Sequence, residues 1–221
     1  MRLSHYRTSL LCIAVALLAG CAAPAKRDYT AFRQARPASI LVLPPLNESP
    51  DVNATFSMLA QSTYPLAEAG YYVVPVTLMA ETFKQNGLDN APDIHQTSPA
   101  KLKEIFGADS ALYIKVTRYG SSYTVLSSAA VVSAEAQLVD LSTGTQLWSG
   151  QATASNDEGN NGGGNIIAVL VTAVVKQIMN NLSDASHGVA GVTAARMLSA
   201  GTPNGILYGP RSPKYGKDAQ D

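Results

Sequence analysis

Cys21 is the side chain of this sequence whose surroundings most clearly indicate chemistry. The residues before it combine a basic start, with Arg2 and Arg7, a short apolar run over residues 10–18, and small residues directly before the cysteine. This combination is typical of a secretory signal peptide. The apolar run is too short to cross a bilayer comfortably, since a membrane-spanning helix needs about 20 apolar residues. We therefore expect residues 1–20 to act as a signal peptide.

The tetrapeptide Leu18-Ala19-Gly20-Cys21 resembles the lipobox of bacterial lipoproteins. In signals of that kind the cysteine thiol is acylated and the chain is cut directly before it. The resemblance implies a mature chain that starts at Cys21 and is tethered to a membrane by lipid. Ala22 follows, whereas an aspartate there resembles the signal for retention in the inner membrane, so we expect the outer membrane and its periplasmic face. The alternative is an ordinary signal peptide followed by a chance cysteine.

Few other side chains are suited to catalysis or metal binding. Cys12 would leave with the signal and Cys21 would carry lipid, so we expect no disulfide and no free thiol in the fold. His95 and His187 are the histidines that remain, and neither has a cysteine or second histidine at metal-ligand spacing. No Gly-x-Ser-x-Gly pattern indicates an acyl-transfer serine. We predict no catalytic, cofactor or metal site, and a protein that is not an enzyme.

A glycine- and asparagine-rich run over residues 159–164 precedes a predicted helix. Free N–H groups at the start of a helix attract phosphate, so the run has one property of a phosphate-binding loop. It lacks the Gly-Lys-Ser/Thr ending of such loops, and no clear buried strand leads into it. A flexible loop is the favoured interpretation.

The charge balance excludes nucleic acid as a partner. Without the signal peptide the chain has 14 basic and 16 acidic residues, and therefore no overall excess of positive charge for nucleic acid or anionic lipid. Charged residues make up only 14% of the whole sequence and apolar residues 46%. A surface with so few charges is typical of a protein that packs against partners or copies of itself. A surface rich in Ser, Thr, Asn and Gly would explain the same composition.

The first half of the mature chain predicts alternating strands and helices. Residues 21–38 are small and polar and are interpreted as a tether, with a short helix near residues 29–34. The unbroken apolar run of residues 40–43 predicts a strand buried on both faces. Beyond it we expect a helix over residues 51–69, with Val52, Phe56, Leu59 and Leu66 near one face, and a strand over residues 71–76. A second helix should follow, capped by Thr77 and ended by Gly87. After a polar loop over residues 88–97, we expect a third helix from Pro99 to Gly107.

The second half changes to an alternation of apolar and polar residues. It runs through Leu112, Ile114 and Val116, and again from Val132 to Leu138, which is the period of strands with one buried face. A turn at residues 140–144 and a returning strand over 145–154 complete an antiparallel meander. Trp148 in that strand is interpreted as a core residue. The fold class is therefore α+β, a mixed sheet with helices packed on it, in a single globular domain over residues 39–200.

Two segments are candidate interaction surfaces. Residues 166–182 predict a helix that is apolar over most of its girth, which favours either a buried core helix or an interface between copies of the chain. A helix is predicted near residues 189–200. The segment 201–221 after it is rich in Pro and Gly, which predicts an irregular tail. The candidate contact residues are Ile167, Leu170, Val171, Val174 and Ile178 in the helix, and Leu207, Tyr208, Pro210 and Arg211 in the tail.

Three segments resemble counterparts in known domains. Residues 40–49 are similar to the opening strand and loop of CsgG-like and TolB N-terminal-like domains, residues 107–116 to their Gly-Ala-Asp element and strand, and residues 138–149 to their hairpin. With the tail over residues 205–211, the chain resembles a family of Gram-negative outer-membrane lipoproteins of unknown function. This resemblance implies a CsgG-like or TolB-like fold, an accessory role in envelope assembly or export, and CsgG-like lipoproteins as partners.

The favoured hypothesis is thus a non-enzymatic envelope lipoprotein that binds other proteins, held to the membrane through Cys21. The alternative is a periplasmic module that binds a small ligand or a glycan. In that case the loops at residues 44–53 and 88–97 would form the binding site. A hydrolase has the least support, because no nucleophile and base can be paired from the sequence.

Overall fold

The computed structural model describes residues 27–123, 128–158 and 185–218. The predicted signal peptide, Cys21, the glycine-rich run 159–164 and the predicted helix over residues 166–182 lie outside these residues. Among the residues that are described, no helix has the length and apolar character needed to cross a bilayer.

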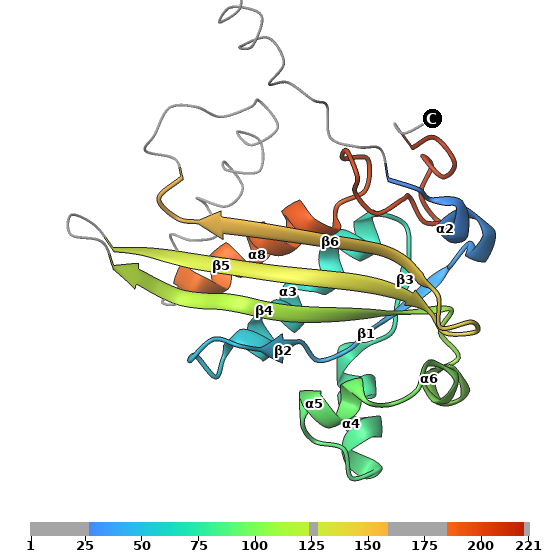
Figure 1. Cartoon of the computed structure of the whole chain (residues 1–221), viewed down its shortest axis with the longest axis horizontal. Helices are drawn as coiled ribbons and strands as arrows, with labels where there is room; N and C mark the ends of the chain where they lie inside the picture. The colour runs from blue at the N-terminus through green and yellow to red at the C-terminus, as the bar shows by residue number, and fades with distance from the viewer. Residues whose placement is uncertain (1–26, 124–127, 159–184, 219–221) are drawn as a thin grey trace, which may run out of the picture.

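A six-stranded mixed sheet lies at the centre of the molecule (Figure 1). Its strands follow the order β3 (Tyr72–Val73), β1 (Ser39–Val42), β4 (Ser110–Tyr123), β5 (Ser128–Asp140) and β6 (Gln146–Ser155), and β2 (Leu46–Asn47) pairs with β4 further along that strand. β1 pairs parallel with β3 and β4, and β2 pairs parallel with β4, whereas β5 pairs antiparallel with both β4 and β6. The predicted α+β class, with a mixed sheet and an antiparallel meander, is confirmed.

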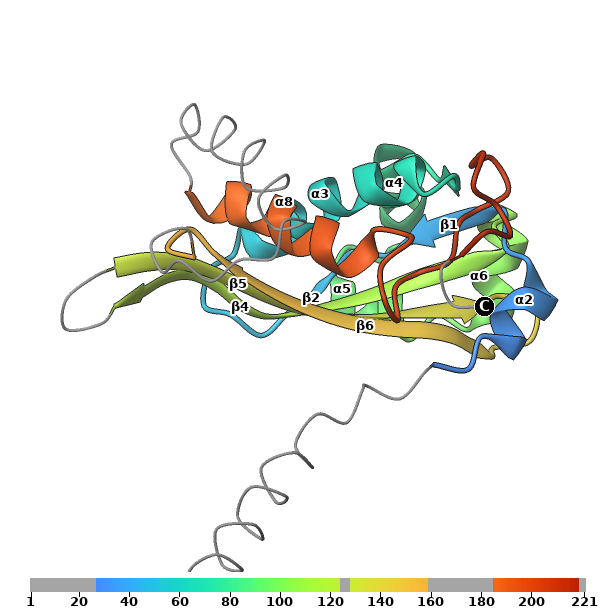
Figure 2. The ribbon, with the colours of Figure 1, turned by 90° about the horizontal axis from the view of Figure 1, so that it is seen from above.

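The helices lie around this sheet. Figure 2 shows α3 (Ala54–Glu68) and α8 (Ala185–Leu198) side by side over one face of the long strands. The other helices within the described residues are α2 (Thr30–Ala35), α4 (Val76–Gln85), α5 (Ala91–His95) and α6 (Pro99–Phe106). α6 begins and ends as the sequence predicts, because the Ser98 side chain accepts a hydrogen bond from the Lys101 N–H and Gly107 has a φ of 65°.

The core lies between the sheet and the pair α3 and α8. The alternating residues are buried as predicted, and Trp148 is only 2% exposed. The register of β4 against β5 shifts between Val116 and Arg118, which is the position of a β-bulge. The bulge adds one residue to β4. Val116 and Tyr119 therefore both lie on the buried face of the sheet, although they are three positions apart and a regular strand would need two or four.

Asp109 of the Gly-Ala-Asp element joins the start of β4 to β1. Its Oδ2 atom accepts hydrogen bonds from the backbone N–H groups of Ala38 and Ser39 and from the Ser39 hydroxyl, at 2.9, 3.0 and 2.8 Å. Partial burial acts to raise the pKa of Asp109, but these hydrogen bonds outweigh it and hold the pKa below its usual value. The element is therefore a structural junction between two strands.

Several local predictions are wrong, and tertiary packing explains most of them. Val52 and Phe56 are 80% and 74% exposed, because α3 begins at Ala54 and buries the face that carries Met58, Leu59 and Leu66. Thr77 is not a cap, since α4 already begins at Val76. The strand predicted over residues 71–76 has only two residues. The loop predicted over residues 88–97 contains α5, whose first turn is capped by Asn90.

Both ends of the described chain pack onto the domain. In the segment interpreted as a tether, Tyr29 and Phe32 are each 4% exposed. In the segment interpreted as a tail, Ile206 and Leu207 are buried, and the Tyr29 hydroxyl donates a hydrogen bond to the Gly205 carbonyl. The domain boundaries drawn at residues 39 and 200 thus leave out segments that contribute to its core.

Candidate functional site

A groove lies on the face of the sheet opposite α3 and α8. Its floor is made by outward-facing side chains of two neighbouring strands, with Tyr113 of β4 directly opposite Gln137 of β5, and Lys115 opposite Glu135. Leu46 of β2 and His95 of α5 form one wall. The groove is open to solvent and has a volume of about 370 Å³. This size and mixed lining suit a small polar ligand or one or two residues of a longer chain.

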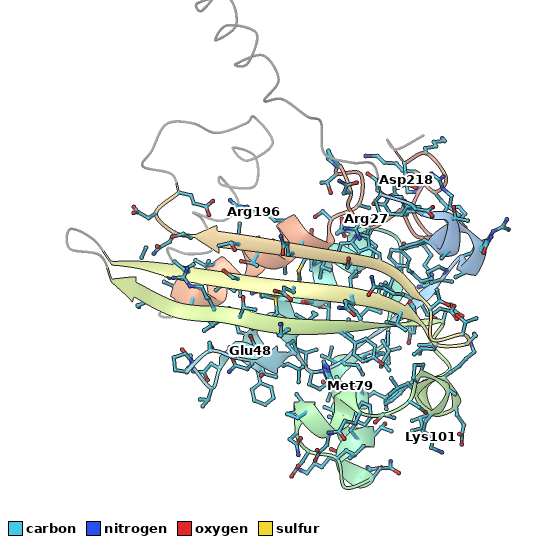
Figure 3. The ribbon with its side chains drawn as sticks, in the orientation of Figure 1. Arg27, Glu48, Met79, Lys101, Arg196 and Asp218 are labelled. Atoms are coloured by element: carbon cyan, nitrogen blue, oxygen red, sulfur yellow. The ribbon has the colours of Figure 1, made fainter. Side chains whose placement is uncertain are left out.

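A lysine between two carboxylates forms the charged part of the groove. The Lys115 Nζ atom lies 3.4 Å from a carboxylate oxygen of Glu135 and 3.7 Å from one of Glu48. Figure 3 shows Glu48 near β2, beside the β4 strand that carries Lys115. All three side chains are more than one third exposed, so each ion pair contributes at most about 1 kcal/mol to stability. Their charges therefore remain available to a ligand.

His95 forms the aromatic part of the groove together with Tyr113. The His95 Nε2–H donates a hydrogen bond to the Pro44 carbonyl at 2.9 Å, and the two rings meet edge to face with their centroids 5.3 Å apart. Burial lowers the pKa of His95 below its usual value, despite the hydrogen bond to Pro44, and raises the pKa of Tyr113. The groove therefore presents a neutral imidazole and a protonated phenol near pH 7.

The lowered pKa of His95 predicts a loss of stability on mild acidification. The unfolded chain binds a proton at its ordinary pKa near 6.5, before the folded chain does, so stability falls as the pH drops from 7 toward 5. We expect the melting temperature of the wild type to fall by a few degrees more than that of His95→Gln, whose amide can still donate to Pro44. Thermal unfolding of both proteins at pH 7 and pH 5 measures this difference. Parallel curves would show that His95 is not the titrating group.

The sequence predicted only part of this groove. The two loops assigned to a ligand site, residues 44–53 and 88–97, contribute Leu46 and His95 to its wall. Tyr113, Lys115, Glu135 and Gln137 were missed, because in sequence they are the ordinary polar half of an alternating strand. Only the pairing of β4 with β5 shows that these four side chains share one surface.

A row of exposed apolar side chains follows the outer face of α3. Phe56 and Tyr64 are 74% and 70% exposed, and Val52, 80% exposed, lies two residues before the helix. Phe56, Ala60 and Tyr64 stand four positions apart, so they line one side of the helix, and Val52 continues the same spacing in the turn before it. We call Val52, Phe56, Ala60 and Tyr64 the α3 row. Large apolar side chains gathered on one exposed helix face are typical of an interaction surface.

The candidate residues of the tail have different surroundings. Leu207 is 5% exposed and its carbonyl accepts a hydrogen bond from the Tyr71 hydroxyl at 2.6 Å, so its side chain belongs to the core and does not face a partner. Tyr208 is half-buried beside Lys214. Pro210 and Arg211 are exposed, and the Arg211 guanidinium lies over the Tyr72 ring at 5.2 Å. The role of these two in binding stays a prediction.

A serine and a histidine meet between α3 and α8, which the sequence did not predict. The Ser57 hydroxyl lies 2.7 Å from Nδ1 of His187, and the Gln61 amide lies 2.9 Å from Nε2 of the same ring. Ser57 is only 6% exposed, and an amide occupies the position where a triad has its carboxylate. The three side chains therefore link the two helices, which explains the arrangement without a hydrolytic role.

The described part of the chain holds no group of three or more His, Cys, Asp or Glu side chains placed to bind a metal ion. The remaining candidates lie outside it. They are the lipid site Cys21 and the predicted contact residues Ile167, Leu170, Val171, Val174 and Ile178.

The chain is similar to lipoproteins of Neisseria meningitidis. A family model described as "Putative lipoprotein GNA1162-like" matches residues 27–211. The lipoprotein NMB1124/NMB1162 of serogroup B is 54% identical over 184 residues, which is 83% of this chain and 85% of that one. The crystal structure of lipoprotein GNA1162 has 56% identity and a TM-score of 0.54, over 66% of this chain and all of that one. On these grounds, this chain belongs to the GNA1162-like lipoprotein family.

Proposed function

We propose that the protein is a non-enzymatic accessory in envelope assembly or export, which acts by binding other envelope proteins. Lipid on Cys21 would hold it to the periplasmic face of the outer membrane. Family membership supports a lipoprotein, and the resemblance of residues 40–49, 107–116 and 138–149 to CsgG-like domains supports CsgG-like lipoproteins as partners. A second copy of the chain is also a candidate partner, through the helix predicted over residues 166–182.

The observation that carries this proposal is the exposure of the α3 row. Phe56 and Tyr64 are exposed to water, and a partner that buried them would gain about 2 kcal/mol of binding free energy from each side chain. Both rings lie on α3, so a partner would meet a pre-formed surface and would lose little conformational entropy on binding. The α3 row is therefore the most favourable place on the described surface for a protein contact.

The test compares two exposed aromatic residues with an exposed aliphatic one. We expect Phe56→Ser together with Tyr64→Ser to weaken the complex with an envelope partner at least about 30-fold, since two central aromatic contacts contribute about 2 kcal/mol or more. Chemical crosslinking in intact cells, followed by mass spectrometry of the crosslinked lipoproteins, measures the loss. Leu78→Ser on α4, where the side chain is 58% exposed, is the matched control.

The outcome that contradicts the proposal is equally clear. Because all three side chains are mostly exposed, the variants should unfold at nearly the same denaturant concentration as the wild type. If the crosslinked species have the same abundance in all of them, the α3 row is not the contact surface. If no envelope protein is crosslinked in any variant or in the wild type, the protein-binding function itself fails.

The groove supports a second candidate function, the binding of a small ligand or a glycan in the periplasm. Its lining offers a phenol, an ammonium group, a carboxylate and an amide within one open groove of about 370 Å³. Sugars are recognised by such polar groups together with an aromatic face. We expect cell-wall fragments at millimolar concentration to raise the melting temperature of the wild type and to have no effect on Tyr113→Ala. No shift with the wild type would exclude this function for those fragments.

A further inference from the structure

Positive charge is concentrated in two segments of this otherwise balanced chain. Residues 27–38 and 209–218 carry six basic side chains and only two acidic ones, Asp28 and Asp218. The rest of the mature chain has eight basic and fourteen acidic residues. The near-zero total therefore conceals one basic region on an acidic protein. The six basic residues are Arg27, Arg33, Arg36, Arg211, Lys214 and Lys217, which we call the basic end.

The fold brings the two segments to the same end of the molecule. The Arg27 N–H donates a hydrogen bond to the Asn204 side chain, just before the last segment of the chain. At the other side, the Tyr72 N–H donates to the Ala38 carbonyl, and Arg211 lies over the Tyr72 ring. Figure 1 shows α2 and the last described residues together at one end of the sheet, and Figure 3 places Arg27 and Asp218 there. Five of the six basic residues are exposed, and Arg27 is half-buried.

The chain that follows Cys21, the proposed lipid site, enters the domain at this same end. Arg27 and Tyr29 already belong to the domain, since Arg27 is hydrogen-bonded to Asn204 and Ser149 and Tyr29 is buried. Six residues, Cys21 to Lys26, separate them from the membrane surface if Cys21 carries lipid. Fully extended, six residues reach about 20 Å. Arg27, the first residue of the basic end, thus stays within about two Debye lengths of the headgroups, and the other basic residues lie on the same end of the domain.

We propose that the basic end rests on the membrane surface and binds the headgroups of anionic phospholipids. This inference rests on the proposed lipidation of Cys21. Exposed tyrosines accompany the charges: Tyr72 and Tyr215 are 44% and 45% exposed, and tyrosine is enriched at the level of lipid headgroups. Resting on this end, the domain holds its sheet away from the anchor, and the groove and the α3 row lie along its sides.

An acidic protein is the competing partner for such a surface. The short chain before Arg27 favours the membrane, because it keeps the basic end beside the headgroups at all times, whereas a protein partner must reach the same narrow space. The contribution of each basic residue near an anionic surface corresponds to about a fivefold change in the contact equilibrium. Even two such residues would therefore shift the domain strongly toward contact.

The test uses the full lipidated protein, purified from membranes and reconstituted into vesicles that contain a paramagnetic headgroup quencher. The mature sequence has no cysteine besides Cys21, so single cysteines can be labelled with a fluorophore. Gln34→Cys places the dye on the exposed face of α2. Asp157→Cys places it just beyond the far end of β6, whose last residue, Ser155, lies six residues and about 20 Å along the strand from Ser149, which Arg27 contacts.

We expect strong quenching at residue 34 in vesicles of phosphatidylcholine with phosphatidylglycerol, weaker quenching in phosphatidylcholine alone, and little at residue 157 in either. Arg211→Gln with Lys214→Gln should reduce contact about 25-fold. Lys84→Gln with Arg118→Gln, which removes two exposed charges elsewhere, is the matched control and should leave it unchanged.

Two results would overturn the inference. One is equal quenching at residues 34 and 157, and the other is quenching at residue 34 that depends neither on the anionic lipid nor on Arg211 and Lys214. If residue 34 is instead crosslinked to an acidic protein in cells and ignores the lipid composition, the basic end is a protein-binding surface. Protein that never associates with the vesicles and lacks the acyl mass contradicts the proposed lipidation, whereas vesicle-bound protein without quenching contradicts only this inference.

Discussion

Replacing Cys21 with alanine is expected to remove the protein from the outer membrane and to remove the acyl mass from its N-terminus. A single long acyl chain gives only weak and reversible membrane binding, with an association constant of about 10⁴ M⁻¹, and two or more chains give stable anchoring. Losing all of them should therefore deplete the protein from the outer-membrane fraction. Mass spectrometry of the mature N-terminus and fractionation of the envelope measure the two effects.

Cys12→Ala is the control for this experiment. It removes the other cysteine of the sequence, keeps the run over residues 10–18 apolar, and lies in the segment that we expect to be cut off. We expect this variant to carry a diacyl or triacyl mass at Cys21, as the wild type does. An unmodified wild-type N-terminus in the soluble periplasm would contradict the anchor and would make the small-ligand function the leading candidate.

The parts of the fold that depend on neighbouring residues could be predicted from the sequence. The apolar run at residues 40–43 lies in β1 up to Val42, and its four side chains are at most 1% exposed. The turn at residues 140–144 forms because the Asp140 side chain accepts hydrogen bonds from the Ser142 and Thr143 N–H groups, and Gly144 adopts a φ of 72°. Both signals are complete within a few consecutive residues.

The parts that depend on distant contacts could not be predicted. Helical periodicity placed Phe56 and Leu66 near one face, but α8 and the sheet cover the face of Met58, Leu59 and Leu66 and leave Phe56 in water. The tail has no regular pattern from which local rules could predict burial. Ile206 is nevertheless 1% exposed, because its neighbours Gly205 and Leu207 are hydrogen-bonded to Tyr29 and Tyr71 of the domain.

The candidate groove could likewise be predicted only in the part that depends on neighbouring residues. The two loops that flank the groove were predicted as a ligand site, but the side chains of its floor come from β4 and β5, and their alignment depends on strand pairing. The basic end was hidden in the sequence, because its two halves are more than 170 positions apart and the total charge is close to zero. Spatial arrangement, not composition, makes both of them surfaces.

The contact between Gly70 and the tail predicts a large loss of stability from a single added methyl group. Gly70 has a φ of 97°, which L side chains rarely adopt, and a Cβ atom there would lie 2.4 Å from the Ser212 N atom and 2.9 Å from the Gly209 carbonyl oxygen. The obstruction is backbone on both sides, and the tail is held there by hydrogen bonds from the Gly209 N–H to Ala69 and from the Arg211 N–H to Gly70. It cannot move aside without breaking them.

We therefore expect Gly70→Ala to lower the free energy of unfolding by about 3–4 kcal/mol, because a positive φ costs an alanine about 1–2 kcal/mol and the lost tail contacts add to this. Gly87→Ala is the matched control, since Gly87 has a φ of 76° and no atom within 4 Å of the added Cβ, so its cost is the backbone term of about 1 kcal/mol alone. Urea unfolding measures both values, and faster trypsin cleavage after Arg211 and Lys214 in Gly70→Ala would show that the tail is released. Equal losses in the two variants would mean that the contact of residues 209–212 with Gly70 adds nothing to stability, and Arg211 and Lys214 would then have no fixed position from which to meet a membrane.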